Sequence, residues 1–189
     1  MKLKLRDITD SPDKNRWCGP SVISAVTKLT TGEAARLIRE LTGKRKVTGT
    51  YPIEIRSALE ACNIQMVQLQ FTGVVERYNG PDLKPKTDAE GRREYDPRSS
   101  ITLSRWLRNT VKIRNAERVF LVVGANHWQL VCGRRYICGL TRKIVSVKQA
   151  RFRRGRITAV FELLSNNVQI PEIIKQYRKN HPAKASTRG

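Results

Sequence analysis

The stretch of the 189-residue chain that most clearly indicates its fold is residues 118–138, RVFLVVGANHWQLVCGRRYIC. It contains three short apolar runs that are rich in β-branched and aromatic residues, as β-strands usually are. Two similar runs follow it before residue 165. The five strands predicted in this way cover residues 118–123, 127–132, 135–138, 144–147 and 157–164. The second half of the chain is therefore expected to form a sheet.

The first third of the chain has the period of helices instead. Apolar residues recur at helical spacing over residues 19–29 and 32–42 and again after Pro52, which predicts three helices. Pro20 suits the first turn of the first helix, because a proline there loses no hydrogen bond. A chain with helices first and strands afterwards favours an α+β fold with an antiparallel sheet. We expect the first helix, which starts at Cys18, to pack against that sheet.

Shorter features complete the outline. Alternation of apolar and polar residues predicts a further strand over residues 64–71. Short helices are expected over residues 101–109 and after Pro171. Residues 72–100 hold several glycines and prolines among many charges, which predicts a long loop.

The length fits one domain, which we place at residues 1–164, followed by a basic polar tail at residues 165–189. No apolar run approaches the ~20 residues needed to cross a bilayer. The N-terminal residues lack the apolar stretch of a secretory signal peptide, and four cysteines are too few for a disulfide scaffold. We therefore expect a globular protein of the cytoplasm that does not span a membrane.

The charge of the chain is strongly positive, with 37 Lys and Arg against 16 Asp and Glu and a formal net charge of +21. The excess is uneven, since residues 134–156 include many basic residues and neither Asp nor Glu. Such a patch is typical of contact with phosphates or with an acidic protein, although a solvated surface has a similar composition. The polyanion-binding candidates are Arg142, Lys143, Lys148, Arg151, Arg153, Arg154 and Arg156. With no aromatic platform beside them, sequence-specific reading of bases is not expected.

Cys18 lies at the expected start of the first helix. The free N–H groups and the dipole of a helix N-terminus stabilise negative charge, so a thiol there has a lowered pKa. A thiolate is the nucleophile of cysteine hydrolases, and the same N–H groups hold an oxyanion. The alternative is a small buried hydrophobe at the start of a core helix, which is the commoner role of an isolated cysteine.

His127 favours the first interpretation. It stands at the start of a predicted strand roughly 100 residues after Cys18, and an early cysteine with a late histidine is the layout of a Cys–His nucleophile pair. A purely structural histidine in a strand is the alternative. The other histidine, His181, lies in the polar tail and is a poor candidate. We therefore predict Cys18 and His127 as the catalytic pair.

Four short motifs in chain order resemble those of papain-like cysteine peptidases, most closely the C39-like type and small phage and bacterial papain-like proteins. They are WCGPS at residues 17–21, GTYP at 49–52, ITLSRWL at 101–107 and NHW at 126–128. The resemblance implies a helix that carries the nucleophile, packed on an antiparallel sheet that carries the histidine. It also implies a thiol hydrolase acting on a peptide or isopeptide carbonyl. A phage origin would place the protein in the host cytoplasm or in the virion.

The chain departs from that family at two supporting positions. The family places a Gln about six residues before the cysteine for the oxyanion hole; here Pro12 stands at that position, and Asn15 is the nearest amide. The family also places an Asp or Asn on the strand after the histidine to orient its ring, yet residues 128–161 contain no Asp, Asn or Glu. Thr141, Gln129 or a backbone carbonyl remain as orienting candidates, and each is weaker than a carboxylate.

The sequence contains no motif that indicates a metal or a cofactor. The four cysteines include no C-x-x-C pair, so zinc is not expected, and no Gly-rich phosphate loop occurs. We expect neither a metal nor a cofactor.

Two functions stay open. One is a thiol hydrolase that uses the Cys–His pair. The other is a papain-like fold with a decayed site, which binds nucleic acid or an acidic partner through its basic patch, for example inside a phage particle.

Overall fold

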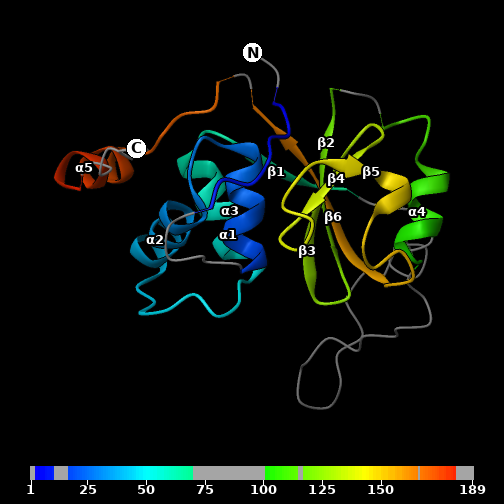
Figure 1. Ribbon diagram of the computed structural model, residues 1–189, viewed down its shortest axis with the longest axis horizontal. Helices are drawn as coiled ribbons and strands as arrows, with labels where there is room; N and C mark the ends of the chain where they lie inside the picture. The colour runs from blue at the N-terminus through cyan, green and yellow to red at the C-terminus, as the bar shows by residue number, and fades with distance from the viewer. Residues whose placement is uncertain (1–2, 11–16, 70–100, 115–116, 166, 182–189) are drawn as a thin grey trace, which may run out of the picture.

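The computed structural model describes residues 3–10, 17–69, 101–114, 117–165 and 167–181. These residues form an α+β architecture in which a group of helices lies beside a sheet (Figure 1). The α-helices are α1 (Cys18–Val26), α2 (Thr31–Thr42), α3 (Pro52–Ala61), α4 (Leu103–Asn109) and α5 (Glu172–Asn180). The strands are β1 (Gln65–Gln68), β2 (Val119–Gly124), β3 (His127–Cys132), β4 (Arg135–Cys138), β5 (Val145–Ser146) and β6 (Ile157–Leu164), and a 3₁₀ helix, η1, spans Val147–Gln149. No helix in the described part of the chain is both long and apolar enough to span a membrane.

All neighbouring strands of the sheet are antiparallel, and their order is β1-β6-β2-β3-β4-β5. The prediction of an α+β fold with an antiparallel sheet is therefore confirmed. β3, β4 and β6 have the predicted bounds. The long loop predicted over residues 72–100 lies outside the described residues.

The first helix and the strand predicted over residues 144–147 are shorter than their apolar pattern indicated. α1 ends at Val26 and not at Leu29. The hydroxyl of Thr27 explains the difference, because it donates to the carbonyl of Ile23 at 2.8 Å and accepts from the N–H of Leu29 at 3.1 Å. A threonine hydroxyl bonded in this way competes with helical hydrogen bonds. The strand predicted over residues 144–147 shrinks to β5, because the chain turns into η1 directly after it.

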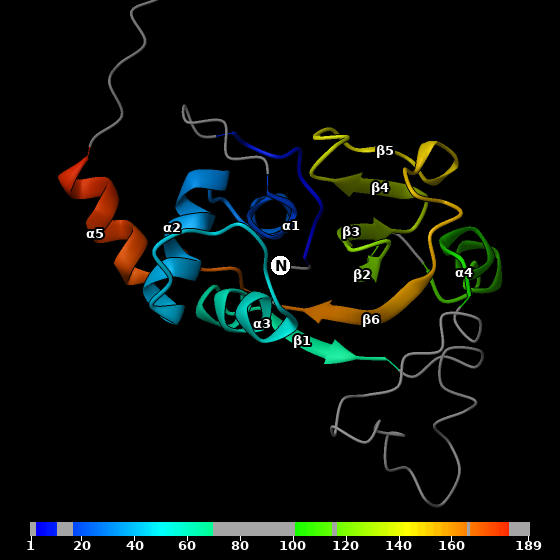
Figure 2. The same cartoon turned by 90° about the horizontal axis from the view of Figure 1, so that it is seen from below.

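The sheet lies between two hydrophobic cores, because alternate residues of a strand point to opposite faces. One core is shared with α1, α2 and α3, and the other with α4 on the far side of the sheet (Figure 2). Trp128 and Leu130 of β3 and Ile137 of β4 belong to the first core. Val131 and Tyr136, from the same two strands, belong to the second. This alternation decides which face of the sheet each site residue occupies.

α1 joins the helical part of the molecule to the sheet. All its residues from Gly19 to Val26 are buried, and it packs against α2 and α3 as well as against β3 and β4. The predicted packing of this helix on the sheet is therefore confirmed. Cys18 is the one residue of the helix that stays partly exposed.

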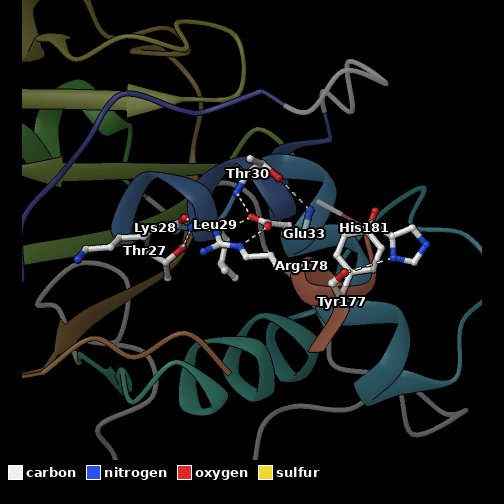
Figure 3. A network of polar contacts seen from close by, with 8 residues as sticks. All are labelled: Thr27, Lys28, Leu29, Thr30, Glu33, Tyr177, Arg178 and His181. Carbon is white, nitrogen blue, oxygen red and sulfur yellow. Dashed lines mark hydrogen bonds and ion pairs between the residues drawn. The ribbon is translucent and has the colours of Figure 1, made fainter. Parts of the chain in front are cut away.

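α5, in the polar tail, docks on α2 through an ion pair (Figure 3). The guanidinium of Arg178 donates to both carboxylate oxygens of Glu33, at 2.6 and 2.9 Å, and to the carbonyl of Lys28 at 3.1 Å. Glu33 also accepts from the N–H of Thr30 and so completes the capping box of α2. Burial raises the pKa of Glu33, but the bonds from Arg178 and Thr30 outweigh it and the pKa is lower than usual. Ile174 of α5 is fully buried, so this helix is part of the folded structure.

Replacing Arg178 by Ala is expected to lower the free energy of unfolding by about 1–2 kcal/mol at neutral pH, because the largely buried carboxylate of Glu33 loses its cation. The matched control is Lys175→Ala on the same helix, since the ion pair of Lys175 with Glu172 is exposed and contributes little.

The effect of Arg178→Ala depends on pH with a defined sign. Because the folded-state pKa of Glu33 is lowered from 4.5, the contribution is present above pH 4.5 and is lost as the pH falls through the folded-state pKa. Urea unfolding of the wild type and the two variants, at neutral and acidic pH, measures both effects. Equal destabilisation by the two substitutions would contradict this role of Glu33.

Candidate active site

Cys18 is the first residue of α1, after Trp17, whose extended backbone forms the N-cap. A side chain after the cysteine would clash with the neighbouring segment, because a Cβ on Gly19 would lie 2.3 Å from the hydroxyl oxygen of Thr50. Gly19 thus allows the segment before α3 to approach the start of α1 closely. Pro20 then continues the first turn without losing a hydrogen bond. The Cys-Gly-Pro sequence therefore holds a thiol at a helix N-terminus with a neighbouring segment beside it.

His127 is the first residue of β3 and follows a two-residue turn. Ala125 and Asn126 have positive φ values of 52° and 55°, as in the type I′ turn that joins two antiparallel strands. Gly124 of β2 pairs with His127 across this turn. The imidazole lies against the ring of Phe152, with the ring centroids 5.0 Å apart. The turn and Phe152 together restrict where the imidazole points.

The thiol of Cys18 lies within hydrogen-bonding reach of the His127 imidazole. Burial raises the pKa of this thiol. Hydrogen bonds from His127 and from the backbone N–H groups of Trp128 and Gly19 outweigh burial, so the pKa is lower than that of an ordinary cysteine. The structure thus brings together the two residues that the sequence predicted as a pair.

A second thiol, Cys138 at the end of β4, also lies within reach of the His127 imidazole. Gln129 pairs with Cys138 across β3 and β4. His127 precedes Gln129 by two positions, so its side chain shares the face of Cys138 and stands diagonal to it. Cys138 is completely buried. Sequence reasoning missed it by searching for a carboxylate or an amide, although the predicted bounds of the two strands carried this signal.

The contact with the two thiols shifts the pKa of the imidazole. Burial lowers the pKa of His127, but its interactions with Cys138 and Cys18 raise it to about 9. Burial raises the pKa of Cys138, yet hydrogen bonds from His127 and Tyr136 and from the backbone N–H of Thr141 lower it to about 7. The Nε2 atom of His127 is buried without a hydrogen bond of ordinary geometry to any described residue. The raised pKa of His127 favours the protonated form of the ring near neutral pH.

The two orienting candidates taken from the sequence make their hydrogen bonds elsewhere. The hydroxyl of Thr141 accepts from the N–H of Cys138 at 3.0 Å and holds the end of β4. The side-chain amide of Gln129 accepts from the hydroxyl of Tyr136 at 2.8 Å and donates to the carbonyl of Gly124 at 3.3 Å. Thr141 and Gln129 thus support the residues around the imidazole and do not hydrogen-bond to it.

The pair opens into a pocket of about 590 Å³. Its walls come from the start of α1, the start of β3 and the segment before α3. The indole N–H of Trp128 donates to the carbonyl of Thr50 at 3.3 Å and fixes that segment to β3. Two lining aromatic residues, Trp17 and Tyr51, are 48% and 69% exposed. The oxyanion candidate Asn15 lies outside the described residues.

The polyanion-binding candidates differ in exposure. Arg142 is half-buried and forms an ion pair with Asp10, which neutralises its charge and makes it a weak candidate. Arg153 is exposed and donates to the backbone carbonyl of Lys148 at 2.8 Å. The other candidates, all exposed, are Lys143, Lys148, Arg151, Arg154 and Arg156.

The geometry offers a thiol with a partner for proton transfer. In the described part of the chain, no three Cys, His, Asp or Glu residues are arranged to hold a metal ion. Comparison of the chain with protein-family models, curated proteins and solved structures gives no match. The resemblance to papain-like peptidases stays a prediction, and the site is interpreted from its own residues.

Removal of the Cys138 thiol is expected to lower the pKa of His127. In the wild type, the ring protons should titrate with a midpoint of about 9. In Cys138→Ala the midpoint should fall toward 6.5, because a nearby negative charge that favours the imidazolium is gone. NMR titration of the imidazole ring protons measures this midpoint. The His181→Gln variant identifies which signals belong to the second histidine.

The matched control is Cys62→Ala. Cys62 is also completely buried, but burial alone raises the pKa of its thiol to about 12, so it stays neutral. Its removal should leave the His127 midpoint unchanged. An unchanged midpoint in Cys138→Ala would show that the second thiol does not act on the ring.

Proposed function

We propose that this chain is a thiol hydrolase of papain-like arrangement that cleaves a peptide or isopeptide bond, with Cys18 as nucleophile and His127 as proton carrier. One observation carries the proposal. The Cys18 thiol, at the N-terminus of α1, lies within hydrogen-bonding reach of the His127 imidazole, and both line one pocket. A buried helix start and a hairpin turn hold the two residues from different parts of the fold.

The charge state of the pair suits nucleophilic attack. Cys18 has a lowered pKa and His127 a raised one, so at neutral pH the imidazole holds a proton beside a sulfur that readily loses one. The thiolate Sγ attacks the carbonyl carbon of the substrate, and the carbonyl oxygen takes up the negative charge. Pro20 has no N–H, so the N–H groups of Cys18 and Gly19 are those of the first turn without a carbonyl partner within the helix, and they stabilise that oxyanion.

The two halves of the reaction use the same imidazole, first as an acid and then as a base. His127 gives its proton to the leaving nitrogen as the C–N bond breaks, which leaves a thioester on Cys18 and a neutral imidazole. The imidazole then takes a proton from water, whose oxygen attacks the thioester. Breakage of the C–S bond releases the carboxylic acid product and restores the thiolate beside the imidazolium. Atoms and charges balance over the cycle, and no cofactor takes part.

In this proposal Cys138 is a positioning residue. It lies on the strand after the histidine, where the resemblance calls for an Asp or Asn. A thiol whose pKa is lowered to about 7 carries substantial negative charge at neutral pH, and this charge favours the imidazolium and restrains the ring. Tyr136 also helps to lower the pKa of this thiol, and its hydroxyl donates to the side-chain amide oxygen of Gln129.

The pocket favours a polypeptide substrate. Trp17 and Tyr51 offer exposed aromatic surface next to the thiol, and aromatic side chains are enriched where proteins contact other proteins. Lys44, which also lines the pocket, forms an ion pair with the buried Glu54. Because this ion pair offsets the charge of Lys44, the wall has no strong charge of its own. We therefore expect the substrate to be recognised mainly by its backbone and apolar side chains.

The proposal is tested first by the reactivity of Cys18. Iodoacetamide at pH 6 should label Cys18 at least ~10-fold faster than any other cysteine, because its thiolate is stabilised and it is the partly exposed thiol of the four. His127→Ala should reduce this rate by roughly 10-fold or more, since the stabilising imidazolium is lost. Peptide mapping by mass spectrometry gives the rate for each cysteine.

Turnover is the second part of the same test. A pool of fluorogenic peptide amides should be hydrolysed by the wild type, and Cys18→Ser should abolish the hydrolysis. Cys132→Ser, which alters a fully buried thiol at the far end of β3, should retain it. If Cys18 is labelled no faster than Cys132, the thiolate assignment is wrong. If labelling is selective but no peptide or isopeptide is cleaved, the pair is intact and the hydrolase assignment is wrong.

The role of Cys138 predicts an asymmetry between two substitutions. Cys138→Ala should lower kcat by roughly 10- to 100-fold with little change in KM, because a freely rotating ring transfers its proton poorly. Cys138→Asn should restore most of kcat, because an amide can hold the ring by a hydrogen bond without a charge. The pH at which kcat is half-maximal on the alkaline side should shift downward in both variants, in line with the lower His127 pKa. Equal kcat in the wild type and Cys138→Ala would contradict the positioning role.

A further inference from the structure

A second pocket, of about 600 Å³, lies beside α4 and has a different character from the first. Its walls come from α4, from the turn between β3 and β4 and from the region of η1. Five basic residues line it, and none of the described residues that line it is Asp or Glu. We call these residues the basic groove: Arg108, Arg114, Arg134, Lys148 and Arg153.

Hydrogen bonds hold the walls of the basic groove in fixed positions. The guanidinium of Arg114 donates to the carbonyl of Leu107 at 2.6 Å and to the carbonyl of Gly133, which ties the end of α4 to the β3–β4 turn. The N–H of Val147 donates to the carbonyl of Arg134 at 2.9 Å and ties η1 to the same turn. The groove is therefore preformed, and a ligand would not have to order it.

The loop before β6 closes the groove on its remaining side. The N–H of Ser104, in the first turn of α4, donates to the carbonyl of Arg153 at 2.8 Å. The N–H of Leu103 donates to the carbonyl of Gly155 at 2.9 Å. The side chain of Arg153 reaches back to the carbonyl of Lys148. The cations thus come from four separate segments that backbone contacts hold around one hollow.

The charge of the basic groove has no neutralising carboxylate among the described residues that line it. Other arginines of the fold form ion pairs, such as Arg118 with Glu162 and Arg178 with Glu33. Arg114 is half-buried, and its guanidinium donates to neutral oxygens. Arg108 and Arg134 are exposed on the walls. Several like charges that converge on one hollow without an anion favour a ligand that supplies negative charge.

The side chains that line the basic groove suit a ligand with a series of linked phosphate groups. Guanidinium groups bind phosphate oxygens with two parallel hydrogen bonds, and the hydroxyls of Ser104 and Ser146 add donors to the same walls. The remaining lining includes Leu107 and Val111 but no aromatic side chain among the described residues, so bases would find no stacking platform. Exposed basic residues also continue outside the hollow, in Arg151 and Arg154, as expected for a ligand longer than the groove.

We propose that the basic groove binds the phosphodiester backbone of a nucleic acid, independently of its base sequence and of the Cys18–His127 site. The formal net charge of +21 supports the choice of a long polyanion, because such a field raises the rate of encounter with one. The proposal does not rest on the thiol chemistry. The groove begins directly after the last residue of β3, whereas His127 is the first residue of that strand.

The experiment compares two double charge reversals that change the net charge equally. Arg108→Glu with Arg134→Glu alters the groove, and Lys28→Glu with Lys179→Glu alters exposed lysines on the helical side of the molecule. Fluorescence anisotropy with a labelled single-stranded oligothymidylate of about 20 nucleotides gives Kd at several salt concentrations. The groove variant should raise Kd by about 10-fold or more. It should also flatten the slope of log Kd against log salt by about 1.4, because the variant no longer neutralises two of the phosphates. The control should change Kd by less than about 3-fold.

Further measurements identify the chemical class of the ligand. Unlabelled oligonucleotides of different base sequence should compete equally, and poly-glutamate of similar length should compete poorly. Cys18→Ser should bind as the wild type does. If circular dichroism shows that charge reversal impairs folding, Arg108→Gln with Arg134→Gln repeats the test with a smaller change. The proposal is overturned if the helical-side control weakens binding as much as the groove variant, if poly-glutamate competes as well as the oligonucleotide, or if the wild type does not bind at low salt.

Discussion

Burial of α1 against α2, α3, β3 and β4 ties the helical part of the molecule to the sheet. Every residue of this helix after Cys18 is buried, so the helix cannot shift along its axis without exposing apolar surface or creating voids. Its N-terminus is fixed in consequence, and the free N–H groups of the first turn always face the same place. The thiol that begins the helix is therefore held at the edge of the sheet, where β3 begins.

The register of β3 with β4 sets the position of His127 in a similar way. Because Gln129 is paired with Cys138, the side chains of His127, Gln129 and Cys138 all point to one face. A slip of one residue would turn the imidazole and the second thiol to opposite faces. The buried hydrogen bond between Tyr136 and Gln129, at 2.8 Å, favours this register, because any other would leave buried polar groups without partners.

β3 also separates the two proposed sites, and one loop reaches both of them. His127 begins the strand and Gly133 follows its end, which at ~3.3 Å per residue places the two turns roughly 20 Å apart. In the loop before β6, Phe152 packs on the imidazole, and Arg153 lines the basic groove. The proposed thiol chemistry and the proposed anion binding therefore do not compete for the same residues.

Local sequence patterns predicted the element types, the antiparallel α+β class and the two residues of the proposed catalytic pair. These follow from local periodicity and from the chemistry of a thiol at a helix start. The placement of Cys138 beside His127 and the assembly of the basic groove are visible only in the folded chain. The sequence around a cysteine does not show which side chain it will contact. Arg108 and Arg134 line the same groove because α4 packs beside the β3–β4 turn. Long-range packing and strand register set which side chains lie close together in space. Neither can be read from the spacing of residues along the chain.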